Sequence, residues 1–242
     1  MDVFFYDKLF LLEKKHWWYQ ARDNILMKLL EHYGIFNSSK KILYCGLGCG
    51  SLFGKILKKN NNIIGLDNEW QSLKLTQKNN DGFKKVFLGN ASSINFKYKF
   101  DFILAFDLIE HIKNDNDFIT NSYNNLADNG LLILTMPAFN FLFGTPDIIG
   151  KHYRRYTKTD LKKLLVNKFE IEFISYMNFL LFPIVLITRL FNKLFNNKLI
   201  DDFNIKKESK ILFFLFEIEK KFFPKLSLPW GTSVLCVVKK KI

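Results

Sequence analysis

The segment ILYCGLGCGSLFG at residues 42–54 constrains the fold more than any other part of the chain. A short apolar run leads into Gly46, Gly48 and Gly50, and a helical pattern follows. Glycine permits a sharp turn and lets a ligand approach the backbone closely, although a strand-to-helix turn alone could also explain these glycines. The dinucleotide fingerprint requires another glycine or alanine three residues after its second glycine. Ser51 and Phe53 occupy the two candidate places, so the pattern disfavours NAD binding.

Short apolar runs alternate with helical patterns beyond this turn, which predicts a mostly parallel sheet wound with helices on both faces. We expect parallel strands at 40–44, 62–67, 85–88, 100–106 and 130–135, with helices that include 51–60 and 116–128. Two later runs, at 169–177 and 233–239, predict a closing pair at the sheet edge. The expected fold class is therefore α/β: a Rossmann-like, doubly wound, seven-stranded sheet with an antiparallel closing strand and a helical insertion before the last strand.

Length and hydrophobic content are consistent with one domain over residues 1–242. A helical pattern from Phe4 to Tyr33 predicts an N-terminal helical cap at 1–36, with Gly34 as the stop. The apolar insertion covers about 178–229 and predicts helices at 180–199 and 209–223. Charged residues interrupt the apolar residues near the start, so we expect no secretory signal and a cytoplasmic location.

The net charge of +13 invites a nucleic-acid interpretation, because positive charge attracts polyanions. However, the 36 basic residues comprise 32 lysines and 4 arginines, and Asn, Phe and Ile are also abundant, as expected from a compositional bias. Charge therefore carries little weight, and nucleic acid is disfavoured as a partner. The three cysteines lack the paired spacing of a zinc site, so we predict no metal site.

Four motifs occur in a recognisable order along the chain: GxGxG at 46–50, IIGLD at 63–67, GNA at 89–91 and FDFILAFDLIEHI at 100–112. Together they resemble the motifs of class I S-adenosylmethionine-dependent methyltransferases. The resemblance implies that the chain is an enzyme of this kind and that its cofactor is S-adenosylmethionine.

The resemblance also implies roles for particular residues. The three glycines would border the amino-acid and ribose parts of the cofactor, and Asp67 would accept hydrogen bonds from both ribose hydroxyls. A helix N-cap is the alternative role for Asp67, and a place in the core is the alternative for Phe106. The remaining expected cofactor contacts are Asn68, Asn90, Ala91, Phe106 and Asp107.

One position departs from the family pattern. The family usually has an acid two residues before the first glycine of the turn, where it helps to organise the cofactor's amino group. This chain has Tyr44 there. The Tyr44 hydroxyl could substitute for the acid, or cofactor binding could be weakened.

The resemblance extends to a bacterial-type subgroup with an HWW start, here residues 16–18, and an HYRRYT segment, here residues 152–157. We expect one of the two adjacent arginines to face the cleft and the other to anchor the segment, because adjacent side chains before a helix cannot point the same way. His111 and His152 are the candidate catalytic bases, with a structural role as the alternative. The expected acceptor-binding residues are Trp18, Arg22, Tyr153, Arg154 and Arg155.

The acceptor is expected to be a small molecule, a sugar or a lipid-linked molecule. A non-catalytic cofactor-binding or membrane-associated interaction protein is the alternative, and nucleic-acid methylation is motivated by charge alone. The apolar run at 179–187 is too short to span a bilayer. The amphipathic stretch that follows favours a cap on the sheet or a dimer partner over a membrane surface at the inner face of the membrane. The sequence does not indicate an oligomeric state.

Overall fold

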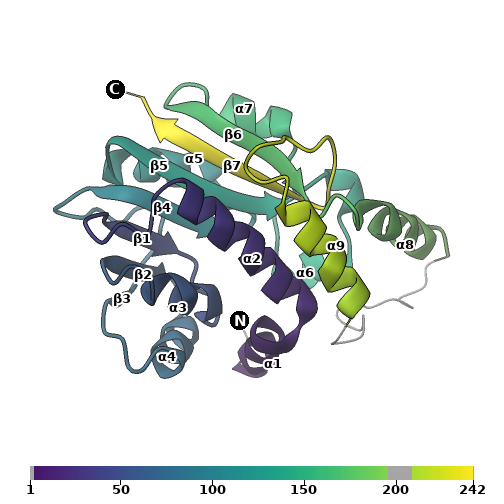
Figure 1. Cartoon of the computed structure of the whole chain (residues 1–242), viewed down its shortest axis with the longest axis horizontal. Helices are drawn as coiled ribbons and strands as arrows, with labels where there is room; N and C mark the ends of the chain where they lie inside the picture. The colour runs from purple at the N-terminus through teal and green to yellow at the C-terminus, as the bar shows by residue number, and fades with distance from the viewer. Residues whose placement is uncertain (1–2, 196–208, 242) are drawn as a thin grey trace.

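A computed structural model describes residues 3–195 and 209–241 and contains a seven-stranded sheet in the order β3-β2-β1-β4-β5-β7-β6 (Figure 1). Strands β1 to β5 are parallel, and β7 is antiparallel to both β5 and β6. This arrangement confirms the predicted fold class and the closing pair. The strands are β1 Ile42–Cys45, β2 Ile63–Asp67, β3 Val86–Leu88, β4 Phe100–Phe106, β5 Leu126–Pro137, β6 Phe169–Met177 and β7 Ser233–Lys240.

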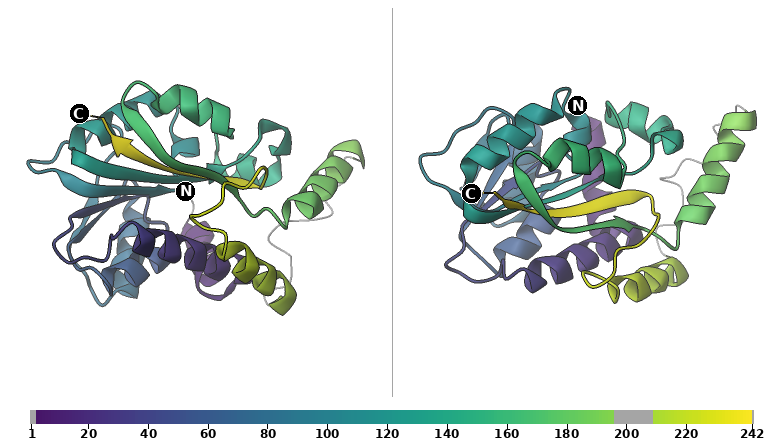
Figure 2. Two further views of the ribbon diagram at one scale, coloured as in Figure 1. Left: turned by 45° about the horizontal axis from the view of Figure 1, so that its top comes forward. Right: turned by 90° about the horizontal axis from the view of Figure 1, so that it is seen from above.

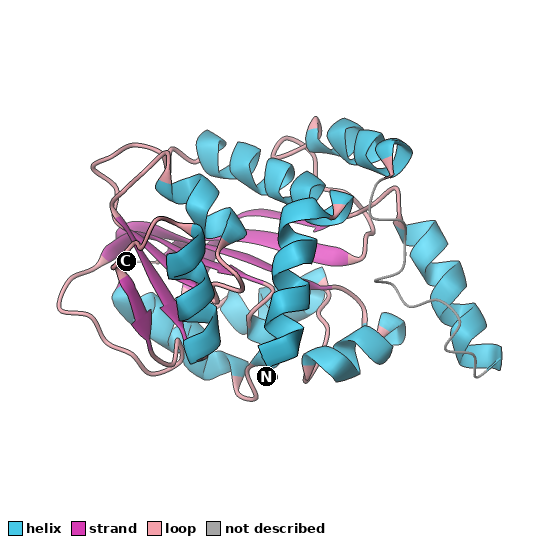
Figure 3. Ribbon diagram, turned by 90° about the horizontal axis from the view of Figure 1, so that it is seen from below, coloured by secondary structure: helices cyan, strands magenta, loops and turns pink. Residues whose placement is uncertain are grey.

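Helices cover both faces of the sheet (Figure 3). Side chains alternate between the faces along β1, so that Ile42 and Tyr44 pack into one apolar core while Leu43 and Cys45 pack into the other. Residues of α2, α3 and α9 join the first core, and residues of α5 and α7 join the second. The helices are α1 Val3–Lys15, α2 Trp17–His32, α3 Ser51–Leu57, α4 Trp70–Asn79, α5 Asp115–Asn125, α6 Thr145–Gly150, α7 Lys158–Leu165, α8 Phe182–Phe195 and α9 Lys210–Lys220, with 3₁₀ turns η1 Ile109–His111 and η2 Asn140–Leu142.

The helical pattern from Phe4 to Tyr33 corresponds to two helices, α1 and α2. His16 has an extended backbone between α1 and α2, and its Nδ1 accepts a hydrogen bond from the Trp18 backbone N–H at 3.2 Å. The side chain therefore caps α2 and separates the two axes. The apolar periodicity runs through this break, which explains why the pattern did not reveal it. As a result α1 turns toward α3 and α4.

The insertion contains the two predicted helices, which differ in their packing. The helix α9 lies beside α2, where the rings of Phe216 and Trp17 have centroids 5.6 Å apart. By contrast, α8 stands away from the sheet (Figure 2) and exposes an apolar face, on which Ile187 is 67% exposed. Residues 196–199 of the predicted first helix lie outside the described residues. No helix in the described ranges is long and apolar enough to cross a membrane.

The packing of α9 on α2 yields a stability prediction. Phe216 is 1% exposed, whereas Phe214 on the same helix is 64% exposed. Phe216→Ala should lower the free energy of unfolding by about 3–5 kcal/mol, because it leaves a cavity in the core. Urea denaturation should show less than about 0.5 kcal/mol for the control Phe214→Ala. Equal effects of the two substitutions would mean that α9 does not pack on α2 in solution.

Candidate functional site

The candidate site lies at the carboxyl ends of the parallel strands. The strand order reverses between β1 and β4, and ligands of open α/β sheets bind at such a switch point. The glycine turn follows β1, and Asp107 follows β4. Asp67 is paired with Leu88 at the ends of β2 and β3, and the GNA motif comes directly after. The structure therefore brings the four predicted motifs together at the carboxyl ends of the parallel strands.

The glycine turn has the left-handed backbone that favours glycine. The φ angles of Gly46, Gly48 and Gly50 are 78°, 58° and 81°. A Cβ at Gly50 would lie 2.8 Å from the Thr76 Cα on α4, so this glycine is required by helix packing. At Gly48 a Cβ would lie 2.6 Å from Oε1 of Glu13. Close contacts with Thr76 and Glu13 therefore explain part of the requirement for glycine in this turn, in line with the alternative explanation that a strand-to-helix turn alone needs these glycines.

Glu13 of α1 is a site residue that the sequence analysis missed. Its carboxylate accepts hydrogen bonds from the backbone N–H groups of Cys49, at 2.9 Å, and Ser51, at 3.2 Å. These N–H groups lie at the start of α3, where negative charge is favoured. Burial raises the pKa of Glu13 to about 7. An acid is therefore present on the glycine turn, but it comes from the N-terminal cap rather than from the end of β1.

Tyr44, which occupies the place of the usual acid, is a core residue. Its side chain is buried, and its ring centroid lies 5.9 Å from that of Phe53 and 5.7 Å from that of Phe106. Burial raises the pKa of its hydroxyl far above the ordinary range. Phe106 is also buried in this cluster, as its alternative role in the core anticipated.

Asp67 holds the turn in place. Its Oδ2 accepts from the Leu47 backbone N–H and the Ser72 hydroxyl, both at 2.8 Å, and its Oδ1 accepts from the Glu69 N–H at 2.9 Å. The residue that caps α4 is Glu69, so Asp67 is not itself the N-cap. The side chain is half-buried. Among the other predicted cofactor contacts, Ala91 is half-buried, and Asn68 and Asn90 are exposed.

Arg22 connects the N-terminal cap to the end of β4. Its guanidinium forms an ion pair with Asp107, which also accepts a hydrogen bond from Thr135 Oγ1 at 3.2 Å. The rings of Trp18 and Tyr19 lie 5.3 and 5.6 Å from this guanidinium. Two of the predicted acceptor-binding residues, Trp18 and Arg22, thus lie together beside a predicted cofactor residue. The structure places the HWW helix over the switch point.

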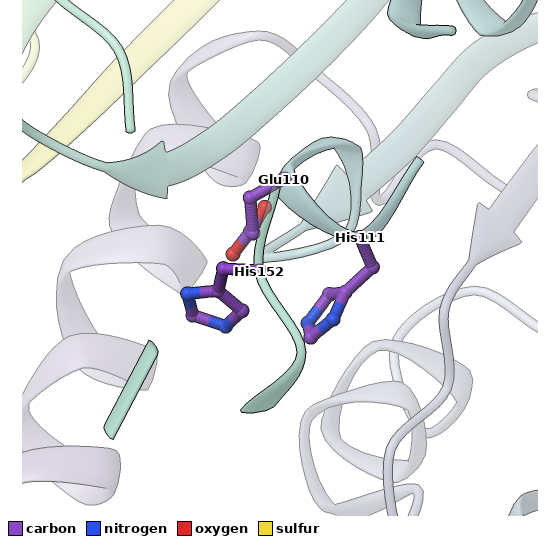
Figure 4. Close-up of side chains that lie close together, drawn as sticks. All are labelled: Glu110, His111 and His152. Carbon is purple, nitrogen blue, oxygen red and sulfur yellow. The ribbon is translucent and has the colours of Figure 1, made fainter. Parts of the chain in front are cut away.

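The two predicted catalytic histidines come from separate segments and meet. His111 belongs to η1, His152 follows α6, and their ring centroids are 4.6 Å apart (Figure 4). Burial, and next the neighbouring His152, lower the pKa of His111 to about 4. Its imidazole is therefore neutral at pH 7. Nδ1 of His152 lies 2.9 Å from Oδ1 of the buried Asp147.

The two arginines of the HYRRYT segment have different partners, and one of them has the anchoring contacts that were expected. Arg155 is the anchor: it is 9% exposed, binds both carboxylate oxygens of Asp147 at 2.8 and 2.9 Å, and donates to the Ala138 carbonyl at 3.1 Å. Arg154 has a side chain that is 30% exposed and pairs with Asp115 at 2.7 Å. It lines a surface pocket of about 490 Å³ on the side of α5 and α7. Tyr153 is exposed.

The helix after this segment begins with Thr157 as its N-cap residue. Thr157 Oγ1 accepts from the Asp160 backbone N–H, and the Asp160 carboxylate accepts from the Thr157 N–H at 2.8 Å. This reciprocal pair is a capping box at the start of α7.

The different surroundings of the two arginines predict different responses to lysine. Arg155→Lys should lower the free energy of unfolding by about 1.5–3 kcal/mol, because an ammonium cannot reproduce two bonds to one carboxylate. The matched control Arg154→Lys should cost less than about 1 kcal/mol, as expected for a partly exposed pair. Thermal and urea unfolding measure both. Equal stabilities of the two variants would contradict the anchoring role of Arg155.

A comparison with protein families matches residues 43–134 to a methyltransferase domain. No curated protein matches the chain significantly. Many solved structures share its fold at low sequence identity. One is the N-methyltransferase NodS from Bradyrhizobium japonicum WM9 in complex with S-adenosyl-L-homocysteine, with a TM-score of 0.58 and 10% identity over 96% of this chain and 91% of that protein.

Two further structures extend the comparison. Phosphoethanolamine N-methyltransferase 2 from Haemonchus contortus, in complex with S-adenosyl-L-methionine, has a TM-score of 0.59 and 16% identity over 89% of this chain; the matched region is 52% of that protein. An S-adenosylmethionine-dependent methyltransferase from Clostridium acetobutylicum has a TM-score of 0.57 and 14% identity over 91% of each chain.

The family match covers the strands from β1 to β5, which carry the glycine turn, Asp67 and Asp107. The sheet order and the ordered motifs agree with it. Residues 43–134 therefore match a methyltransferase domain, and the chain shares its fold with solved S-adenosylmethionine-dependent methyltransferases.

Proposed function

We propose that this chain transfers a methyl group from S-adenosylmethionine to a small-molecule acceptor, and that Glu13, Asp67 and Asp107 line the cofactor site. The observation that carries the proposal is that Glu13 and Asp67 both bind the glycine turn, while Asp107 follows the neighbouring strand β4 at the switch point. Acids suit this cofactor because it presents an ammonium, a sulfonium and two ribose hydroxyls, all of which favour carboxylate partners. The ligands named for two of the structural relatives support the same choice.

Each residue has a distinct part in this proposal. Glu13 would replace the acid that the family usually has at the position of Tyr44, and its carboxylate would bind the ammonium group of the cofactor. Asp67 would bind the ribose hydroxyls with the lone pairs that its bonds to the turn leave free. Arg22, beside Asp107, would bind the cofactor's carboxylate or an anionic acceptor with its planar guanidinium.

Methyl transfer requires little covalent chemistry from the protein. The acceptor atom must be aligned behind the methyl group and shielded from water, and orientation alone can supply much of the rate. Trp18 of the HWW helix lies beside Arg22, which pairs with Asp107 at the end of β4, and its ring would exclude water there. His111 and His152 are the proposed groups on the acceptor side. The relative from Haemonchus contortus acts on phosphoethanolamine, which supports a small acceptor.

Calorimetry with S-adenosylmethionine tests the cofactor site. Asp67→Ala should weaken binding by about 1.5–3 kcal/mol, which is roughly 10- to 150-fold, because it removes hydrogen bonds to a charged group. Glu13→Gln should weaken binding by about tenfold, since an amide keeps the shape of the side chain but not its charge. The wild-type chain should bind one equivalent.

Glu31→Gln is the matched control, because Glu31 is an exposed acid on α2. It should bind the cofactor as the wild type does. Tighter binding by Glu13→Gln would mean that Glu13 occupies the cofactor's own place and must leave it. Absence of binding by the folded wild-type chain would refute the cofactor site and favour a non-catalytic role.

The exposed face of α8 supports a second proposal. The acceptor would be linked to a lipid, and the protein would reach it at a membrane surface. Ile184, Ile187, Leu190 and Phe191 are exposed on a helix that stands away from the sheet. An apolar helix face on a chain of net charge +13 suits the interface of an anionic bilayer. A dimer partner is the other occupant of this face.

Replacing Ile187 and Phe191 together by serine should abolish flotation with vesicles that contain anionic lipid, because it removes the apolar contact. Cofactor affinity should be unchanged, since α8 lies outside the cofactor motifs. Val166→Ser is the control, because Val166 is exposed on a different helix end. If light scattering shows a dimer that the double variant loses, and the wild type does not float, the face is a subunit contact.

A further inference from the structure

Three potential metal ligands converge beside the candidate site, although the sequence predicted no metal. Glu110 and His111 come from η1, and His152 comes from the segment after α6 (Figure 4). One ligand atom from each lies within 4.8 Å of the others. The two imidazole rings are nearly perpendicular, at 86°.

Glu110 is the unusual member of this cluster. The residue is 0% exposed, and neither carboxylate oxygen has a hydrogen-bond partner among the described side chains and backbone groups of other residues. A buried carboxylate normally requires a partner, because loss of hydration is costly. The nearby Arg155 does not serve, since its guanidinium is bound to Asp147 and to the Ala138 carbonyl. The structure thus has a buried acid whose two oxygens are available to a ligand.

Each histidine is held by a second group. Nδ1 of His152 is bonded to Asp147, whose other oxygen accepts from the Gly144 N–H at 2.8 Å and from Arg155. A ring nitrogen of His111 is bonded to the backbone of Gly150. Such outer contacts fix the ring orientation and leave the second nitrogen of each imidazole for a metal. Carboxylate–histidine pairs of this kind are typical of metal sites.

We propose that Glu110, His111 and His152 bind one divalent transition-metal ion of the zinc or iron(II) class. Two imidazoles and one carboxylate form a donor set that these ions favour and that leaves coordination positions open. Metal–ligand bonds of about 2.0–2.2 Å would draw the three donor atoms closer together. The ion would also neutralise the buried Glu110 carboxylate.

The location of this metal site suggests its use. Asp107 interacts electrostatically with both Glu110 and His111, so the cluster adjoins the end of β4, where the cofactor site is proposed. An oxygen atom of the acceptor, from a hydroxyl, carboxylate or phosphate group, could occupy an open coordination position and be oriented there. This last step rests on the proposed function. Metal binding itself does not.

The test is metal binding by the full chain without cofactor. After chelation and dialysis, the protein is titrated with Zn²⁺ in a calorimeter and with Co²⁺ while visible absorption is recorded. One equivalent should bind, and Co²⁺ should give the absorption of a site with nitrogen and oxygen ligands. His152→Ala and Glu110→Gln should each weaken Zn²⁺ binding by about 100-fold or more, beyond the loss typical of an outer-shell change.

His32→Ala is the matched control, because His32 is an exposed histidine at the end of α2. It should bind Zn²⁺ as the wild type does. Misfolding is separated from ligand loss by Glu110→Gln, which keeps the size of the side chain and breaks no hydrogen bond, so that the metal-free protein should be as stable as the wild type. Thermal unfolding of each protein with and without Zn²⁺ provides the second measurement, since binding to the native state raises Tm.

Two results would overturn the proposal: no Zn²⁺ binding by the folded wild type, or equal binding by the wild type and both ligand variants. If metal binding fails while S-adenosylmethionine still binds, the cofactor site stands and His111 would act through proton transfer instead. If the metal binds and the cofactor does not, the proposed function fails and the metal site stands.

Discussion

The backbone amides of the glycine turn are held by two carboxylates from distant parts of the chain, and the rest of the site depends on this arrangement. Asp67, at the end of β2, accepts from the Leu47 N–H, while Glu13, from α1, accepts from the N–H groups of Cys49 and Ser51. The amide dipoles at the start of α3 favour these negative charges. The glycine turn is therefore held on one side by Asp67 from the sheet and on the other side by Glu13 from the N-terminal cap.

The N-terminal cap is consequently part of the site and not an accessory to it. The break at His16 lets α1 lie over the glycine turn, while α2 brings Arg22 to Asp107. The same helix is supported from behind by α9, through the contact between Trp17 and Phe216. The contact between α2 and α9 thus connects the helical insertion to the carboxyl ends of the strands, where the cofactor site is proposed.

Local patterns predicted the sheet well, because strands such as 100–106 and 169–177 are apolar runs whose limits are set by their own residues. The edge to which the motifs converge followed from the parallel topology. Contacts between residues that are far apart in the sequence leave no pattern of this kind. Glu13 lies in an ordinary amphipathic helix, and nothing near it indicates that its carboxylate meets the glycine turn. Glu110 lies within the motif at 100–112, yet its burial beside His152 depends on the fold of a segment about forty residues away.

The position of β7 between β5 and β6 has a consequence for biosynthesis. Both neighbours precede β7 in sequence, and each pairs with it over most of its length. Until residues 233–240 leave the ribosome, β5 and β6 expose unpaired edges that could pair with other chains. Such nonlocal pairing is also slow to form. The sheet therefore stays incomplete until β7 has been synthesised, and its exposed edges favour aggregation during that interval.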